Sequence, residues 1–99
     1  MFAVSETVQI VYLRSSQYPY EYAIMLQVRN GDGWQTVIVA DNSHEGERRD
    51  KSVDDHHCHR YAGDKKRSAE SLPYEVVDTN DAMAKAIRWF ADDWEELIS

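Results

Sequence analysis

All four histidines and the only cysteine of this 99-residue chain fall within one short window. Asp41-Asn42-Ser43-His44 opens the window, and His56-His57-Cys58-His59-Arg60-Tyr61 closes it about a dozen residues later. Histidine titrates near neutral pH and is also a common metal ligand. The crowding of histidines therefore points to acid–base chemistry or to metal binding.

Metal-free cleavage of RNA is the first chemistry that these residue types could perform. It needs a base for the 2′-hydroxyl, an acid for the leaving oxygen and cations for the phosphate charge. Alternation along a strand would place His57, His59 and Tyr61 on one face and Arg60 on the other. We predict that His57 and His59 form the acid–base pair, and that cations at Arg60, Lys65, Lys66 and Arg67 bind phosphate.

A metal site is the second reading of the same window. His57 and His59 could supply two imidazoles, and His44 or Asp41 could complete the ligand set. The chain has no Cys-x-x-Cys or His-Glu-x-x-His frame. No cofactor is therefore expected, and a divalent metal, if one binds, is predicted at His44, His57 and His59.

A purely structural reading is the third. The histidine run would then be an exposed edge strand with Cys58 in the core and solvated imidazoles. Lys65, Lys66 and Arg67 would be a solvated turn.

Hydrophobic alternation places these residues on a predicted sheet. Asn30-Gly31-Asp32-Gly33 is a strong hairpin signal, because Asn-Gly and Asp-Gly tolerate the positive φ angles of tight turns. A polar, mobile loop is expected at about 42–55, and a short extended segment at 72–77. The predicted strands cover 6–13, 20–29, 34–40 and 56–61.

One amphipathic helix is predicted at about 80–97. Asp78 or Thr79 can cap its N-terminus, and Trp89 lies off the apolar stripe, where it could face a loop or a partner. The stripe consists of Met83, Ile87, Phe90, Trp94, Leu97 and Ile98.

These elements predict an α+β fold for a single domain over residues 1–99. The expected architecture is a four-stranded, mostly antiparallel meander (β-β-β-β-α) with the helix packed on one face against Tyr22, Ile24, Leu26 and Val28. The histidine strand should turn Cys58 inward, with His57, His59 and Tyr61 on the face opposite the helix.

Charge and composition limit the partners. Eleven basic and eighteen acidic residues give a net charge of −7, so binding to RNA would need a local basic patch. The acidity fits a basic protein partner and a halophilic source equally well. A lone cysteine allows no internal disulfide, and no segment has the length and apolarity of a membrane span or a leader. We therefore expect a cytoplasmic protein that does not bind membranes.

The hairpin, the Asp-Asn-x-His motif, the His-x-His-x-Tyr strand, the basic turn and the C-terminal helix together resemble the small TumE-type toxins of toxin–antitoxin pairs and related uncharacterised proteins. The resemblance covers Tyr22 to Leu97. The matching positions are Asp41, Asn42, His44, His57, His59 and Tyr61.

This resemblance implies a small toxin-like domain of a toxin–antitoxin or mobile-element defence system that acts on RNA as a ribonuclease. His57 and His59 would be assisted by His44, Tyr61 would position or donate a proton, and Asp41 would orient a histidine. A cognate antitoxin would be the expected partner, and a homo-oligomer is possible. Two alternatives stay open: a non-enzymatic interaction module (an antitoxin, regulator or inhibitor-like protein) and a small metal-binding protein.

Overall fold

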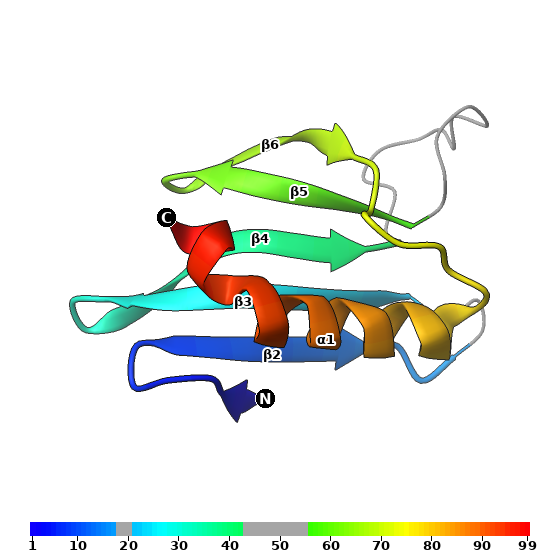
Figure 1. The fold of residues 1–99 in the computed structure, drawn as a ribbon, viewed down its shortest axis with the longest axis horizontal. Coiled ribbons are helices and arrows are strands. Elements are labelled where there is room, and N and C mark those ends of the chain that lie inside the picture. Colours follow the sequence, from blue (N-terminus) through cyan, green and yellow to red (C-terminus); the bar gives the residue numbers. More distant parts are fainter. Residues whose placement is uncertain (18–20, 43–55) are drawn as a thin grey trace.

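The computed structural model describes residues 1–17, 21–42 and 56–99, which form an antiparallel sheet with one helix lying on it, roughly along the strands (Figure 1). The strands lie in chain order, each paired with the next, so the sheet is a simple meander. Their bounds are β1 Phe2–Ala3, β2 Val8–Arg14, β3 Tyr22–Asn30, β4 Gly33–Asp41, β5 His57–Ala62 and β6 Lys65–Glu70, and the helix α1 spans Thr79–Ile98. The α+β class and the C-terminal helix are confirmed.

The predicted number of four strands is wrong. The four predicted strands are present as β2 to β5, and the sheet continues with β6, a fifth long strand, and with the two-residue β1 at the other edge. The segment predicted as a basic turn is the start of β6, and the turn itself is at Gly63-Asp64. Five of the six β6 residues are exposed, so β6 shows no hydrophobic alternation. Lysines are common on such edges because they discourage pairing with other chains.

The predicted hairpin between β3 and β4 is confirmed. Asn30 pairs with Gly33, which leaves Gly31 and Asp32 as the turn residues. Gly31 adopts a φ of 64°, a conformation that a glycine reaches without steric cost.

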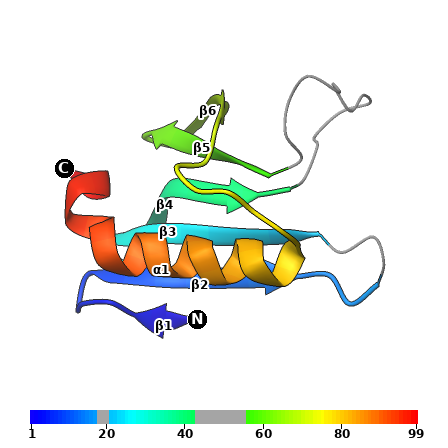
Figure 2. The same ribbon diagram turned by 45° about the vertical axis from the view of Figure 1, so that its right-hand side comes forward.

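The core lies between the sheet and α1, which covers one face of the sheet and runs along β2 and β3 (Figure 2). Tyr22, Ile24 and Leu26 of β3 are buried there as predicted, and Val28 packs against this core half-buried. On the helix, Phe90 has an exposed fraction of 0%. Ala82 and Ala86 form the centre line with Phe90, while Met83, Ile87, Trp94, Leu97 and Ile98 pack half-buried on either side.

Two aspartates fix the start of α1. Asp78 is the N-cap, and its side chain accepts a hydrogen bond of 2.8 Å from the backbone N–H of Asp81. The Asp81 carboxylate in turn accepts a hydrogen bond from Val77 N–H. This bond has the larger effect in lowering the pKa of Asp81, and the hydrogen bond from Lys85 adds to it. This reciprocal arrangement satisfies the Asp81 N–H, which the helix itself leaves unpaired, and ties the residue before the cap to the first turn.

The connection from β6 to α1 covers the side of the core next to the helix. Leu72, Tyr74 and Val76 are half-buried and alternate with exposed residues, which agrees with the predicted extended segment. Trp89 faces this connection: its ring contacts Tyr74 edge-to-face at a centroid distance of 5.8 Å. Among the described residues no helix is long and apolar enough to cross a membrane.

Candidate functional site

The pairing of β4 with β5 brings two parts of the histidine window together. Asp41, the last residue of β4, lies directly opposite His57, the first residue of β5. Ala40 and Cys58, their neighbours in the adjacent pair, are buried in the core under the helix. Because side chains alternate along a strand, Asp41, His57 and His59 lie on the face opposite α1. The predicted orientation of the histidine strand is therefore confirmed for His57, Cys58 and His59.

Asp41 and His57 form a buried pair. Nε2 of His57 lies 2.8 Å from Oδ1 of Asp41, and the two side chains are only 6% and 7% exposed. A buried carboxylate is costly unless a partner compensates it, and the imidazole of His57 lies within ion-pair distance of this one. The resemblance implies that Asp41 orients a histidine, and the histidine that the structure places beside it is His57.

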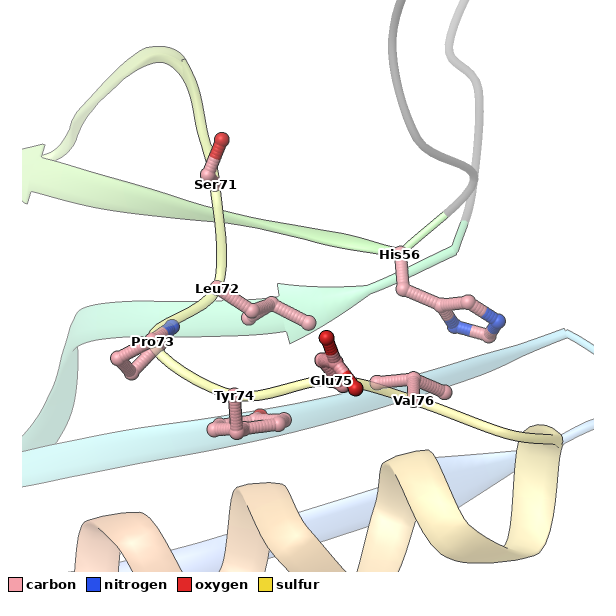
Figure 3. A pocket seen from close by; sticks show the side chains of 7 residues that line it. All are labelled: His56, Ser71, Leu72, Pro73, Tyr74, Glu75 and Val76. Carbon is pink, nitrogen blue, oxygen red and sulfur yellow. The ribbon is translucent and has the colours of Figure 1, made fainter.

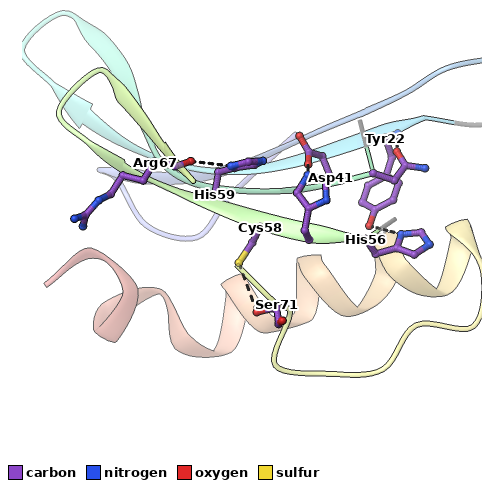
Figure 4. A network of polar contacts seen from close by, with 9 residues as sticks. Tyr22, Asp41, His56, Cys58, His59, Arg67 and Ser71 are labelled. Carbon is purple, nitrogen blue, oxygen red and sulfur yellow. Dashed lines mark hydrogen bonds and ion pairs between the residues drawn. The ribbon is translucent and has the colours of Figure 1, made fainter. Parts of the chain in front are cut away.

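His59 is held by the backbone of the neighbouring edge strand. Its Nδ1 lies 2.8 Å from the carbonyl oxygen of Arg67 (Figure 4). A carbonyl oxygen only accepts hydrogen bonds, so Nδ1 carries the hydrogen in this contact. Nε2 is consequently the nitrogen of a neutral His59 that retains a lone pair, and the ring is half-buried rather than enclosed.

A bulge in β6 accounts for this contact. The pairing runs from His59 opposite Ala69 to Tyr61 opposite Lys66, so β6 contributes one more residue than β5 over this stretch. Arg67 lies within the irregular stretch, where backbone groups leave the regular ladder.

The three side chains converge. The rings of His57 and His59 meet edge-to-face with centroids 4.8 Å apart. One potential ligand atom from each of Asp41, His57 and His59 lies within 4.8 Å of the others. We call this group the Asp41–His57–His59 cluster.

The other predicted site residues do not join the cluster. Tyr61 lines a separate hollow between the two hairpin turns, together with Trp34 and Thr36. Arg60 pairs with Glu70 at 3.2 Å. Lys65 and Lys66 pair with Ala62 and Tyr61, at the end of β5 that lies away from Asp41. The side chain of Arg67 is exposed, and its contact with the cluster is the hydrogen bond between its carbonyl oxygen and His59. His44 and the predicted loop, except for Asn42, lie outside the described residues.

Two contacts near the window were not anticipated. Asn42 accepts a hydrogen bond from the backbone N–H of Tyr22 at 2.9 Å and so secures the ends of β3 and β4. His56 shares a hydrogen bond of 2.9 Å with the Tyr22 hydroxyl and stacks on that ring. Burial and the nearby Asp41 charge raise the pKa of Tyr22, so this hydroxyl stays neutral.

His56 belongs to the helix side of the sheet and not to the cluster. It lines an open hollow with residues of the β6–α1 connection, from Ser71 to Val76 (Figure 3). The sequence contained no signal that would separate His56 from His57, except the alternation that sends adjacent residues to opposite faces.

Cys58 is buried on the core side, with Sγ 4.0 Å from the Ser71 carbonyl oxygen. Burial, followed by the nearby Glu70 carboxylate, raises the pKa of its thiol to about 11. The thiol therefore faces away from the cluster and stays protonated at neutral pH.

We expect Cys58 to resist alkylation in the folded protein. At pH 8 the thiolate fraction should be about a hundredfold lower than in unfolded chains, because only the thiolate reacts and its pKa is raised. Labelling with iodoacetamide, followed by mass spectrometry with and without urea, measures this ratio, and a Cys58→Ser variant gives the background. The native rate should rise about tenfold per pH unit below pH 11. Equal native and unfolded rates would contradict the buried, neutral thiol.

Comparison with known proteins places the chain in a family. A family model described as a domain of unknown function, DUF7718, matches residues 4–99, almost the whole chain. The chain belongs to the DUF7718 family. No curated protein and no solved structure gives a match. The DUF7718 match includes all three members of the Asp41–His57–His59 cluster.

The chemistry available to this DUF7718 domain follows from the cluster. It combines a buried carboxylate, an imidazole within ion-pair distance of that carboxylate and a second imidazole that solvent reaches. Such a set can move a proton, or it can supply two nitrogens and one oxygen to a metal ion.

Proposed function

We propose that this DUF7718 domain cleaves RNA as a small toxin-like protein, with His59 as the group that contacts the substrate. The observation that carries the proposal is the contact between the rings of His57 and His59. His57 lies 2.8 Å from a buried carboxylate, and His59 is hydrogen-bonded to a backbone carbonyl. Fixed, oriented imidazoles are typical of acid–base sites. The resemblance of the Asp-Asn-x-His and His-x-His-x-Tyr motifs to TumE-type toxins supports the same function.

His59 would act as the general base. Its Nδ1–H is committed to Arg67, so Nε2 can take the proton of a ribose 2′-hydroxyl. The 2′-oxygen then bonds to phosphorus, the 5′-oxygen leaves, and solvent water supplies the proton that this oxygen takes up. The products are a 2′,3′-cyclic phosphate and a 5′-hydroxyl.

His57 would be a positioning residue. Its side chain is only 6% exposed, so a substrate meets His59 first. Asp41 fixes the His57 ring, and that ring packs edge-to-face against His59. The pair would thus hold His59 in the orientation that proton transfer requires.

Phosphate binding beside His59 would fall first to Arg67 of β6, because Lys65 and Lys66 lie farther along the strand. The exposed Arg67 lies beside His59 in the sheet, whereas the guanidinium of Arg60 is already paired with Glu70. At a net charge of −7, this local group of cations must offset long-range repulsion of RNA. A toxin of this kind would be held inactive by an antitoxin, which we propose as the partner.

A cleavage assay tests the proposal. We expect the chelator-treated protein to cut a labelled single-stranded RNA oligonucleotide and to leave the all-2′-deoxy oligonucleotide of the same sequence intact, because the ribose hydroxyl is the nucleophile. Mass spectrometry should find 2′,3′-cyclic phosphate ends. Cutting of the deoxy oligonucleotide would exclude this mechanism, and the absence of any cutting would favour the non-enzymatic interaction module.

A further inference from the structure

The Asp41–His57–His59 cluster has the composition of a metal site as well as that of an acid–base site. One potential ligand atom from each side chain lies within 4.8 Å of the others, and Asp41 and His57 are buried. We propose that these three side chains bind one divalent transition-metal ion, of the class of Zn²⁺ or Co²⁺. The site differs from the set predicted from the sequence, because Asp41 takes the place given to His44.

The donor atoms select the class of metal. Two imidazole nitrogens and one carboxylate oxygen suit zinc and its transition-metal neighbours, whereas Mg²⁺ and Ca²⁺ prefer sites made of oxygen. Three protein ligands also leave one position of a tetrahedral ion open, as in catalytic zinc sites. Cys58, the one thiol of the chain, lies on the other face of the sheet and is not a ligand.

The spacing requires only small side-chain movements. Ligand atoms about 3.3 Å apart surround a tetrahedral ion whose bonds are about 2.0–2.1 Å long. The present 2.8 Å between His57 Nε2 and Asp41 Oδ1 would open slightly, and His59 would close in from within 4.8 Å. The paired strands β4 and β5 hold all three Cα positions, so rotation of the side chains suffices.

His59 is already oriented as metal-binding histidines usually are. Such histidines donate their second ring N–H to a backbone carbonyl or a carboxylate, which fixes the tautomer. The hydrogen bond from His59 Nδ1 to the Arg67 carbonyl does this and leaves Nε2 for the ion.

Metal binding would regulate the proposed RNA cleavage, and this consequence rests on the proposed function. A nitrogen bound to the ion cannot accept a proton, so the metal-loaded form would not cleave RNA by the acid–base route. The binding itself does not depend on the RNA reaction and can be measured without it.

The test is a titration of the chelator-treated full chain with Zn²⁺ alone in a calorimeter, followed by Co²⁺ absorption spectra. We expect one ion per chain. Asp41→Asn and His59→Ala should each weaken binding by at least about tenfold, because each removes a ligand. The control His56→Gln changes a histidine on the opposite face and should bind as the unaltered protein does.

Two results would overturn the metal site: no binding at a one-to-one ratio, or equal affinity in His59→Ala and the unaltered protein. The two proposals fail separately. Cleavage of RNA without Zn²⁺ binding would refute the metal site alone. Zn²⁺ binding without cleavage by the metal-free protein would refute the proposed function alone.

Discussion

Replacing His59 by alanine is expected to lower the rate of RNA cleavage by about 10²–10⁴-fold, the usual contribution of a general acid or base. His59 is the half-exposed member of the cluster, and its Nε2 is the nitrogen that can accept the 2′-hydroxyl proton. The measurement is the single-turnover rate on a labelled RNA oligonucleotide, with circular dichroism to show that the variant folds. Added imidazole should restore part of the rate.

Two further variants separate chemistry from positioning. Asp41→Asn keeps the size of the side chain but removes the charge that fixes His57, so we expect kcat to fall while KM stays the same. His56→Gln changes a histidine that contacts Tyr22 on the helix side and should leave both constants unchanged. A His59→Ala rate within twofold of the original would remove His59 from the mechanism.

Replacing Phe90 by alanine is expected to lower the free energy of unfolding by about 3–5 kcal/mol. The Phe90 ring is completely buried between α1 and the sheet and packs against Trp89 at a centroid distance of 5.1 Å. Its removal loses apolar burial and leaves a cavity that the sheet cannot fill. Since domains of this size are stable by about 5–15 kcal/mol, the variant should be close to unfolding. Urea unfolding followed by circular dichroism measures the change.

The matched control for Phe90 is Arg88→Ala on the exposed side of the same helix. This variant should change stability by no more than about 0.5 kcal/mol, since surface substitutions seldom cost more. Phe90→Leu should cost less than Phe90→Ala because it fills part of the cavity. Equal stability of Phe90→Ala and Arg88→Ala would show that the helix does not pack on the sheet through Phe90.

The sequence predicted those parts of the fold that local patterns determine. Asn30 to Gly33 indicated a turn, and the structure places the two-residue turn there. The spacing of Ile87, Phe90 and Trp94 indicated a helix with an apolar stripe, and none of these three residues is exposed. Alternation also predicted which face of the sheet each side chain of this strand occupies. Cys58, as a small apolar residue, was expected in the core, and its two histidine neighbours then point to the opposite face.

The remainder depended on information that no local pattern carries. β6 was missed because an edge strand exposed on both faces needs no apolar residues. The contact of Asp41 with His57 depends on the register of two strands that are separated by fifteen residues, and sequence spacing does not specify a register. The sequence predicted that Tyr61 shares a strand with His57 and His59, and it does. Tyr61 nevertheless lines a hollow that contains neither histidine.

The partner of His59 is an atom that every residue type possesses. Arg67 holds the ring through its carbonyl oxygen, so Arg67→Ala would remove a cation and keep the hydrogen bond. Alanine-scanning mutagenesis would therefore not detect the Arg67 carbonyl, which decides which nitrogen of His59 carries hydrogen. Only a change of the main chain, such as a deletion of Ser68 that removes the bulge, would expose this dependence.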